Sequence, residues 1–299
     1  MSLVEKALKK LHESRAIAEL ASTAARGAAE ALPEGAAAAV AAESSRKSRP
    51  TAPRSGKVVS VNQAALRGAG FFPAEGDEQR LAREYGHIKR PLIAAAKGKG
   101  VPRVPNGRVI MVASALPGEG KTFTTINLAL SLAREKDTTV LLVDADIAKS
   151  HLSQVFGVSA EPGLMDVLLD ESKDIESVII PTSVRGLSIL PAGHHSATAT
   201  ESLASTRMER LVSDLSSDAD RIILLDSPPL LLTTESRALA AIAGQILIVV
   251  RAEATTHQAV RDALACVNVG KPVGVILNQS RFSPQTYYGE YDDAPASPA

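Results

Sequence analysis

The chain has 299 residues, of which 45% are hydrophobic and 22% charged, so it carries enough apolar side chains to bury a sizeable core. Its 33 basic and 33 acidic residues give a formal net charge of +0, which argues against a protein whose main work is to bind nucleic acid through its phosphates. Cys266 is the single cysteine, so an intramolecular disulfide is excluded.

The first 25 residues predict a short amphipathic helix. Val4, Leu8 and Leu11 recur at helical spacing, and charged residues occupy the other side. Such a helix either docks on a partner or a membrane surface or packs weakly on its own domain, and its pattern does not choose between these alternatives.

Residues 26–74 are expected to form a disordered linker. The stretch up to Lys57 is rich in Ala, Ser, Pro and Arg and has no apolar periodicity, so it cannot offset the entropy cost of ordering. Nowhere in the chain does an apolar run approach the roughly 20 residues that a membrane span needs. We therefore expect a cytoplasmic protein.

Residues 75–280 are expected to form one α/β domain. A helix is predicted over residues 77–96, with Pro91 causing a kink or dividing it into two pieces. Short Val/Ile/Leu-rich runs then alternate with helical stretches, as is typical of a mostly parallel central sheet flanked by helices. These predicted strands are residues 108–114, 138–144, 187–193, 221–226, 245–250 and 272–278.

A phosphate-binding loop is the most informative motif. The run SALPGEGKT at residues 114–122 follows a predicted strand and opens a predicted helix, with Ala115 where the usual pattern has Gly. Gly118 and Gly120 allow successive backbone N–H groups to point at phosphate oxygens. Lys121 supplies a charge for the β and γ phosphates, and the Thr122 hydroxyl can ligate Mg²⁺. The sequence therefore predicts ATP and Mg²⁺ as ligands of a P-loop NTPase.

Three carboxylates are expected beside this loop. Asp144 and Asp146 follow one predicted strand, and Asp226 ends another. Since ligands of open α/β sheets lie beyond the carboxyl ends of the strands, all three are expected to face the triphosphate. There they can hold Mg²⁺ or accept a proton, although Asp146 could instead cap a following helix.

Together these motifs resemble the deviant Walker ATPases and, within them, the bacterial protein-tyrosine kinases of exopolysaccharide and capsule assembly, in the subgroup linked to exosortase systems. The matching runs are SALPGEGKTFTTINLALSLA, VLLVDADIAKSHLSQVFG and RIILLDSPPLLLTTESRALA. The resemblance implies an ATP-dependent protein-tyrosine autokinase that phosphorylates its own C-terminal tyrosines in trans and regulates exopolysaccharide polymerisation or export. The chain has Tyr287, Tyr288 and Tyr291 in a tail, residues 281–299, that is expected to be flexible.

The resemblance also implies roles for individual residues. It assigns catalysis to Lys121, Asp144, Asp146 and Asp226, leaving open which of Asp144 and Asp146 is the base, and Mg²⁺ ligation to Thr122, Asp226 and Asp144. For ATP binding it implies Pro117, Gly118, Glu119, Gly120, Lys121, Thr122, Phe123 and Asn278, the last as an adenine contact. For oligomerisation the family uses Glu-x-x-Arg-x-x-Arg, and this chain has Glu84, His87 and Arg90 at those places.

The implied partners are a second copy of the chain, in a homo-oligomer, and an inner-membrane polysaccharide co-polymerase or chain-length determinant protein that would hold the kinase at the membrane periphery. Two alternatives remain. One is a switch ATPase of the division-site or partition type without kinase activity, against which Leu116 counts because it replaces that group's signature lysine. The other is a nucleotide-gated regulator of the co-polymerase.

Overall fold

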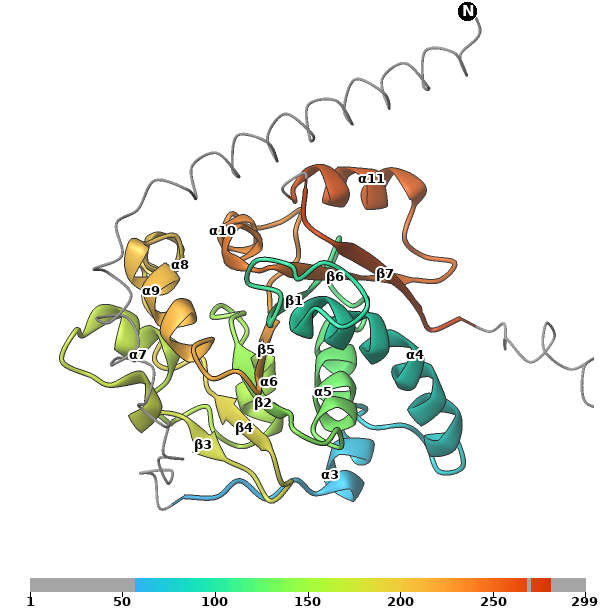
Figure 1. The fold of residues 1–299 in the computed structure, drawn as a ribbon, viewed down its shortest axis with the longest axis horizontal. Helices are drawn as coiled ribbons and strands as arrows, with labels where there is room; N and C mark the ends of the chain where they lie inside the picture. The colour runs from blue at the N-terminus through green and yellow to red at the C-terminus, as the bar shows by residue number, and fades with distance from the viewer. Residues whose placement is uncertain (1–56, 268–269, 281–299) are drawn as a thin grey trace, which may run out of the picture. The chain divides into compact units, whose positions relative to one another are not determined.

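The computed structural model describes residues 57–267 and 270–280. The predicted helix within residues 1–25 and the tyrosines of residues 281–299 lie outside the described residues. The described elements, shown in Figure 1, are α3 Gln63–Gly68, α4 Glu78–Lys97, β1 Val109–Ser114, α5 Lys121–Leu132, β2 Thr139–Asp144, α6 His151–Val155, α7 Leu164–Leu169, η1 Ile175–Ser177, β3 Ile180–Pro181, β4 Leu187–Leu190, α8 Ala199–Leu203, α9 Thr206–Leu215, β5 Arg221–Asp226, α10 Glu235–Ile242, β6 Gln245–Arg251, α11 His257–Ala265 and β7 Val273–Asn278.

A sheet with the strand order β3-β4-β2-β5-β1-β6-β7 forms the middle of the domain. Every neighbouring pair is parallel except β3 and β4, which are antiparallel. The six predicted strands correspond to β1, β2, β4, β5, β6 and β7, so the prediction of a mostly parallel sheet is confirmed. The two-residue β3 escaped prediction because so short a strand carries no periodicity.

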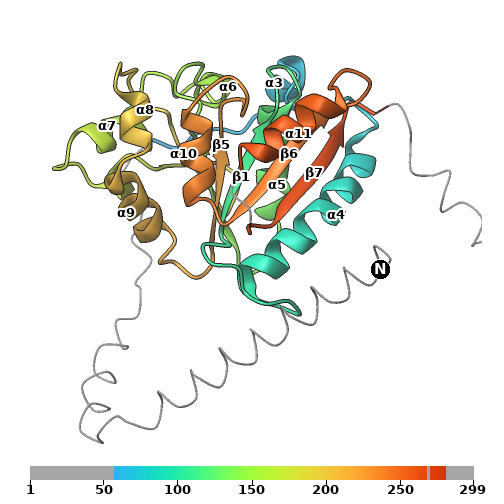
Figure 2. The ribbon, with the colours of Figure 1, turned by 90° about the horizontal axis from the view of Figure 1, so that it is seen from above.

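Helices cover both faces of the sheet because the strands are apolar on both sides. All six residues of β1 are buried. Met111 packs in one core cluster with residues from α7, α8, α9, α10 and α11, whereas its neighbour Val112 packs in another with residues from α3, α4, α5 and α6. Figure 2 shows the two helical layers on opposite sides of the strands.

Helix α4 runs through Pro91 as a single helix, so of the two predicted alternatives the division into two pieces is wrong, and the kink stays a prediction. Its packing explains the continuity. Leu92 and Ala96, which follow the proline, are buried, and the Leu92 carbonyl accepts a hydrogen bond from Nε2 of Gln245 at 3.0 Å. Burial of Tyr85 before the proline and of Leu92 and Ala96 after it thus outweighs the local helix-breaking effect of Pro91.

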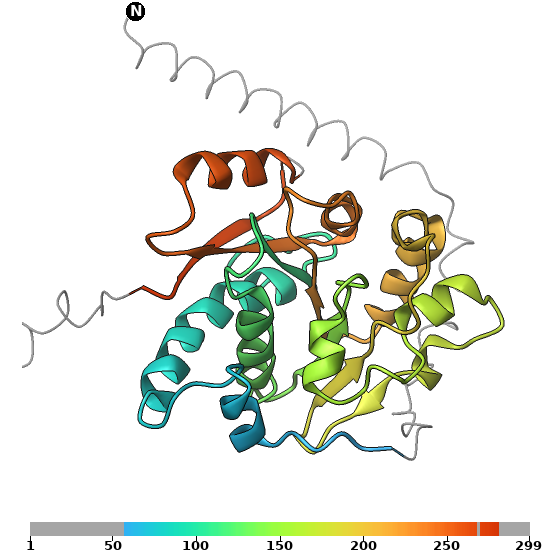
Figure 3. The ribbon, with the colours of Figure 1, turned by 180° about the vertical axis from the view of Figure 1, so that it is seen from behind.

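Residues 57–74 belong to the domain, so the prediction of a linker is wrong for this part, whereas residues 26–56 lie outside the described residues. Val59 forms a β-bridge with Thr182, and Val59 and Leu66 are 5% and 4% exposed within the core. Figure 3 shows this segment passing β3 and β4 before it reaches α3 beside α5. The buried apolar side chains supply the anchoring that residues 26–56 lack in sequence.

Within residues 57–267 and 270–280, none of the helices combines the length and the apolar character that crossing a membrane requires.

Candidate functional site

The predicted phosphate loop connects the end of β1 at Ser114 with the start of α5 at Lys121. Gly118 and Gly120 have φ values of 79° and 92°, which glycine adopts without strain. A Cβ atom on Gly120 would lie 2.0 Å from Nδ2 of Asn278. Backbone conformation and close approach therefore both require glycine at position 120.

A cavity of about 440 Å³ lies over this loop and the first turn of α5. Its volume falls in the range of about 300–1,000 Å³ that is typical of small-molecule sites. Its lining includes seven of the eight residues predicted to bind ATP, and Glu119 is the exception. The lining residues are Gly70, Phe71, Pro117, Gly118, Gly120, Lys121, Thr122, Phe123, Lys149, His151, Asn278 and Gln279.

Glu119 does not line the cavity, and its side chain instead stabilises the loop through hydrogen bonds. The side chain is buried, and its Oε2 accepts a hydrogen bond from the Leu116 backbone N–H at 2.7 Å, while Oε1 accepts one from the Thr255 hydroxyl. Its backbone carbonyl accepts a hydrogen bond from Nδ2 of Asn278 at 2.9 Å. Glu119 and Asn278 thus fix the loop shape, a role that the motif alone does not reveal.

Two of the three predicted carboxylates contact residues of the loop and the following helix. Nζ of Lys121 lies 3.2 Å from Oδ2 of Asp146, and both side chains are nearly buried. The Thr122 hydroxyl donates to Oδ2 of Asp226 at 2.8 Å, and the Thr125 hydroxyl donates to its Oδ1 at 3.1 Å. The first turn of α5 is thereby connected to Asp146, just beyond β2, and to Asp226 at the end of β5.

Asp144 occupies a different position from the other two carboxylates. Its Oδ2 accepts hydrogen bonds from the backbone N–H and the hydroxyl of Ser153, at 2.8 Å and 2.6 Å. Its Oδ1 is buried and has no hydrogen-bond partner within the part of the chain that the structure describes. One carboxylate oxygen thus has a fixed orientation while the other keeps its full capacity to accept a donor or a cation.

Burial shifts the titration of these acids. Loss of solvent raises the pKa of Asp226 to about 7, although the positive charge of Lys121 opposes the shift. Loss of solvent also raises the pKa of Asp144, against the effect of its hydrogen bonds to Ser153. Buried carboxyl groups with raised pKa values beside a lysine and a ligand-sized cavity are typical of a functional site.

The residues fit a magnesium ion that is shared with phosphate oxygens. Within residues 57–267 and 270–280, no group of three or more His, Cys, Asp or Glu side chains converges to hold a metal by itself. The Thr122 hydroxyl oxygen, the Asp226 carboxylate and the unpaired Oδ1 of Asp144 nevertheless supply hard oxygen donors. This is the donor set that Mg²⁺ uses when a nucleotide completes its shell.

The residues predicted for oligomerisation lie on α4. His87 and Arg90 are exposed and Glu84 is partly buried, with Nη1 of Arg80 lying 3.7 Å from Oε1 of Glu84. They share this helix with Tyr85, which is buried. Their side chains are therefore placed where a second protein could contact them.

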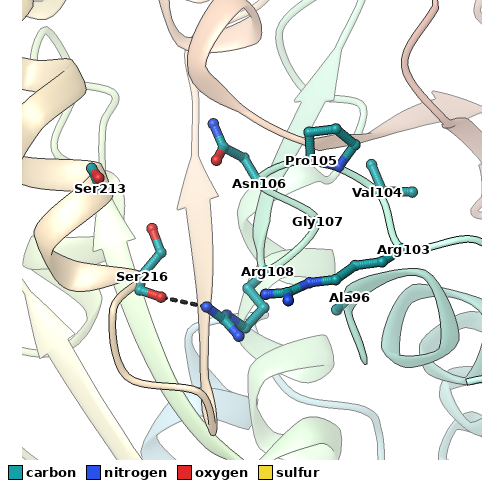
Figure 4. Close-up of a pocket in the computed structure, with 9 residues that line it drawn as sticks. All are labelled: Ala96, Arg103, Val104, Pro105, Asn106, Gly107, Arg108, Ser213 and Ser216. Atoms are coloured by element: carbon teal, nitrogen blue, oxygen red, sulfur yellow. Dashed lines mark hydrogen bonds between the residues drawn. The ribbon is translucent and has the colours of Figure 1, made fainter. Parts of the chain in front are cut away.

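A further cavity, of about 420 Å³, lies before the amino end of β1 (Figure 4). Figure 4 shows Arg103 and Arg108 extending beside it, with Arg108 bonded to the carbonyl of Ser216. None of the predicted site residues lines it. The candidate site is therefore the cavity at the carboxyl end of the sheet.

Several residues at the site were missed by the sequence reasoning. Phe71 and His151 line the cavity, and their rings meet edge to face with centroids 6.3 Å apart. Phe71 falls in the expected linker. The adjacent aromatic residues Phe71 and Phe72 were the sequence signal that this part of the chain packs against the domain. Ser153 lies seven residues beyond Asp146, and no motif marks it as the partner of Asp144.

Comparison with known proteins agrees with this geometry. Residues 107–271 match the AAA domain family. The tyrosine-protein kinase YwqD of Bacillus subtilis is 32% identical over 185 residues, which cover 61% of this chain and 76% of YwqD. The succinoglycan biosynthesis transport protein ExoP of Rhizobium meliloti is 35% identical over 193 residues, which cover 62% of this chain and 24% of ExoP.

The fold comparison gives the same result. The crystal structure of the VpsO kinase domain has 30% sequence identity and a TM-score of 0.57, and the match covers 69% of this chain and 98% of that domain. The matches span about a quarter of the length of most of the curated relatives. The phosphate loop, its paired carboxylates and these similarities together show that the chain belongs to the bacterial tyrosine-protein kinase family of P-loop ATPases.

Proposed function

We propose that this protein is an ATP-dependent tyrosine kinase that phosphorylates Tyr287, Tyr288 and Tyr291 of a neighbouring copy. The observation that carries the proposal is a pair of contacts beside a cavity large enough for a nucleotide. Lys121 forms an ion pair with Asp146, and Thr122 donates a hydrogen bond to Asp226. The identity to YwqD, a tyrosine-protein kinase, supports the choice of acceptor.

In the proposed reaction the phenolic oxygen attacks the γ-phosphorus of ATP. The bond between the γ-phosphorus and its bridging oxygen breaks, ADP leaves, and the phenolic proton passes to a carboxylate. Lys121 and the amides of the loop neutralise the charge on the β and γ phosphates, so catalysis consists mainly of positioning and charge stabilisation. The amide of Asn278 and the ring of Phe123 line the cavity where the nucleoside would lie.

Mg²⁺ would be held by the Thr122 hydroxyl and the Asp226 carboxylate, with Asp144 contributing its unpaired oxygen. When bound, the ion would supply charge neutralisation at the β and γ phosphates. The raised pKa of Asp226 fits a group that gains its full charge only when a cation is near.

The name of one relative supports the proposed cellular setting. ExoP is a succinoglycan biosynthesis transport protein, which supports a role in exopolysaccharide polymerisation or export. The proposed partners are a second copy, contacted through Glu84, His87 and Arg90, and an inner-membrane polysaccharide co-polymerase. The protein would then act on the cytoplasmic side of the membrane.

Incubation of the full chain with Mg·ATP tests the proposal, with phosphotyrosine detection, site mapping and a parallel measurement of ATP hydrolysis. A Tyr287→Phe/Tyr288→Phe/Tyr291→Phe variant is the matched control, and each reaction is run with and without the co-expressed membrane protein. We expect phosphotyrosine confined to the tail and absent from the control. ATP hydrolysis without phosphotyrosine in every reaction would contradict the kinase and favour a switch ATPase.

A further inference from the structure

A second, smaller cavity is lined by Asp146, one of the three carboxylates beside the phosphate loop. Its volume is about 210 Å³, and its walls come from the loop after β2, the start of α8, the loop after β5 and the start of α10. It lies below the range of about 300–1,000 Å³ that is usual for small-molecule sites. Its size therefore suits a single side chain of a bound peptide rather than a second nucleotide.

The Lys121–Asp146 ion pair joins the two cavities. Lys121 lines the nucleotide cavity and Asp146 lines the smaller one, and their charged atoms are 3.2 Å apart. A group bound in the smaller cavity against Asp146 would therefore lie next to the lysine that holds the phosphates. This is the placement that an acceptor of the phosphoryl group needs.

The lining of the smaller cavity is divided between apolar and polar groups. Ile147, Ala197 and Pro228 offer apolar surface. Thr200 and Glu235 add a polar pair, in which the Thr200 hydroxyl donates to Oε1 of Glu235 at 2.6 Å. Tyrosine matches this division, because its ring is apolar and its hydroxyl needs a hydrogen-bond partner when it is buried.

The Thr200 bond favours the ionised form of Glu235. It is the main cause of the lowered pKa of the Glu235 carboxyl group. Oε1 is engaged by Thr200, and an ionised carboxylate has further lone pairs with which to accept a phenolic hydrogen. Glu235 can therefore accept a hydrogen bond from a phenolic hydroxyl, and Asp146 lines the same cavity.

We propose that this cavity, walled by Asp146, Ala197, Pro228, Thr200 and Glu235, is the pocket for the acceptor tyrosine, with Thr200 and Glu235 determining the preference for a phenol. The inference rests on the proposed function and deepens it. Of the two candidate bases, only Asp146 lines this pocket.

The test measures binding and transfer separately. The protein is the full chain carrying Phe at positions 287, 288 and 291, so that its own tail does not compete. The probe is a synthetic peptide with the sequence of residues 283–297, and a matched peptide has Phe in place of each Tyr. Affinity is measured by calorimetry with a non-hydrolysable ATP analogue and Mg²⁺, and transfer is measured with ATP.

Ala197→Phe adds a bulky ring at an exposed residue of the pocket lining, and Ala219→Phe is its control, because Ala219 is an exposed loop alanine outside both cavities. We expect Ala197→Phe to weaken peptide binding by at least about tenfold with unchanged affinity for the ATP analogue, and Ala219→Phe to change neither. We expect Glu235→Gln to reduce the preference for the Tyr peptide over the Phe peptide, because the charged acceptor of the hydroxyl is lost.

The outcomes separate the pocket from the kinase. Equal peptide affinity in the Ala197→Phe and Ala219→Phe proteins, or no measurable peptide binding before substitution, overturns the pocket. Peptide that binds as expected but is never phosphorylated supports the pocket and contradicts the kinase. Phosphorylation that is insensitive to Ala197→Phe and Glu235→Gln leaves the kinase standing and overturns the pocket.

Discussion

Ser153 holds one oxygen of Asp144 with two hydrogen bonds, from its hydroxyl at 2.6 Å and from its backbone N–H at 2.8 Å. The same hydroxyl accepts a hydrogen bond from the backbone N–H of Ala192 at 3.0 Å. Ser153 therefore ties the end of β2 to the segment after β4 and sets the direction of the fully buried Asp144 carboxylate. A residue of α6 thus orients an acid on the sheet.

Ser153→Ala should destabilise the protein by about 1–3 kcal/mol, because Asp144 loses a hydrogen bond and the Ala192 amide loses its buried acceptor. It should also lower kcat for tyrosine phosphorylation more than it raises the KM for ATP, since Asp144 remains present but loses its orientation. Denaturant unfolding and steady-state kinetics measure the two effects. Ser153→Thr, which retains a hydroxyl, should restore part of both, and equal losses in the two variants would contradict a positioning role.

Gly120→Ala should abolish nucleotide binding, because the new Cβ would lie 2.0 Å from Nδ2 of Asn278 in a backbone conformation that favours glycine. Gly118→Ala is the matched variant, since its φ is 79° but no atom lies within 4 Å of the added Cβ. It should lower affinity less. Combining Gly120→Ala with Asn278→Ala removes the clash and should recover affinity toward that of Asn278→Ala alone, which lacks the same hydrogen bond to the Glu119 carbonyl. Calorimetry with ATP measures this, and no recovery would show that the clash is not the cause.

Lys121→Met should lower tyrosine phosphorylation by at least about 100-fold, because the developing charge on the phosphates loses its cationic partner. It also leaves the nearly buried Asp146 without its ion-pair partner. Phosphotyrosine formation over time is the measurement. Lys99→Met, at an exposed lysine after α4, serves as control and should phosphorylate at the original rate; a similar loss in both variants would point to a general effect of charge.

The contribution of Asp226 to the free energy of unfolding of the nucleotide-free protein should fall as the pH rises from about 4 to about 7. Burial raises the pKa of Asp226 from 3.8 to about 7, so across this window the folded protein keeps a proton that the unfolded chain has released. The Asp226 contribution is complete below about pH 4, is lost through pH 7, and reaches up to about 4 kcal/mol.

Asp226→Asn removes this titration and provides the comparison. Its unfolding free energy should depend less steeply on pH between about 4 and 7, while Asp144, whose pKa is also raised, still contributes in both proteins. Denaturant unfolding at a series of pH values measures the difference. Parallel curves for the two proteins would show that Asp226 has an ordinary pKa in the folded state.

Val59→Ala and Val58→Ala form a matched pair that tests whether the segment before α3 belongs to the domain. Val59 is 5% exposed and Val58 is 60% exposed. Val59→Ala should lower the free energy of unfolding by about 2 kcal/mol through lost burial and a new cavity. Val58→Ala should stay within about 0.5 kcal/mol of the unsubstituted protein. Equally small effects of the two substitutions on the free energy of unfolding would mean that burial of Val59 contributes nothing to stability.

Much of the fold could be predicted because its signals are local. The near-continuous apolar runs of β1, β2, β5 and β6 predict strands that are buried on both faces. The loop before α5 predicts a phosphate-binding site, because a glycine-rich turn between a strand and a helix directs several backbone N–H groups at one anion. The continuity of α4 through Pro91 could not be predicted in this way, since contacts far away in sequence stabilise it.

The sequence by itself determined the phosphate loop, the three acids and the parallel sheet, because spacing along the chain encodes each of them. The tertiary structure alone decided how the acids differ: Asp146 faces Lys121, Asp226 faces Thr122, and Asp144 is held by Ser153. It also decided that the segment around Val59 joins the core. These features depend on contacts between residues remote in sequence, and burial and hydrogen bonding between such residues leave no periodic trace in the chain itself.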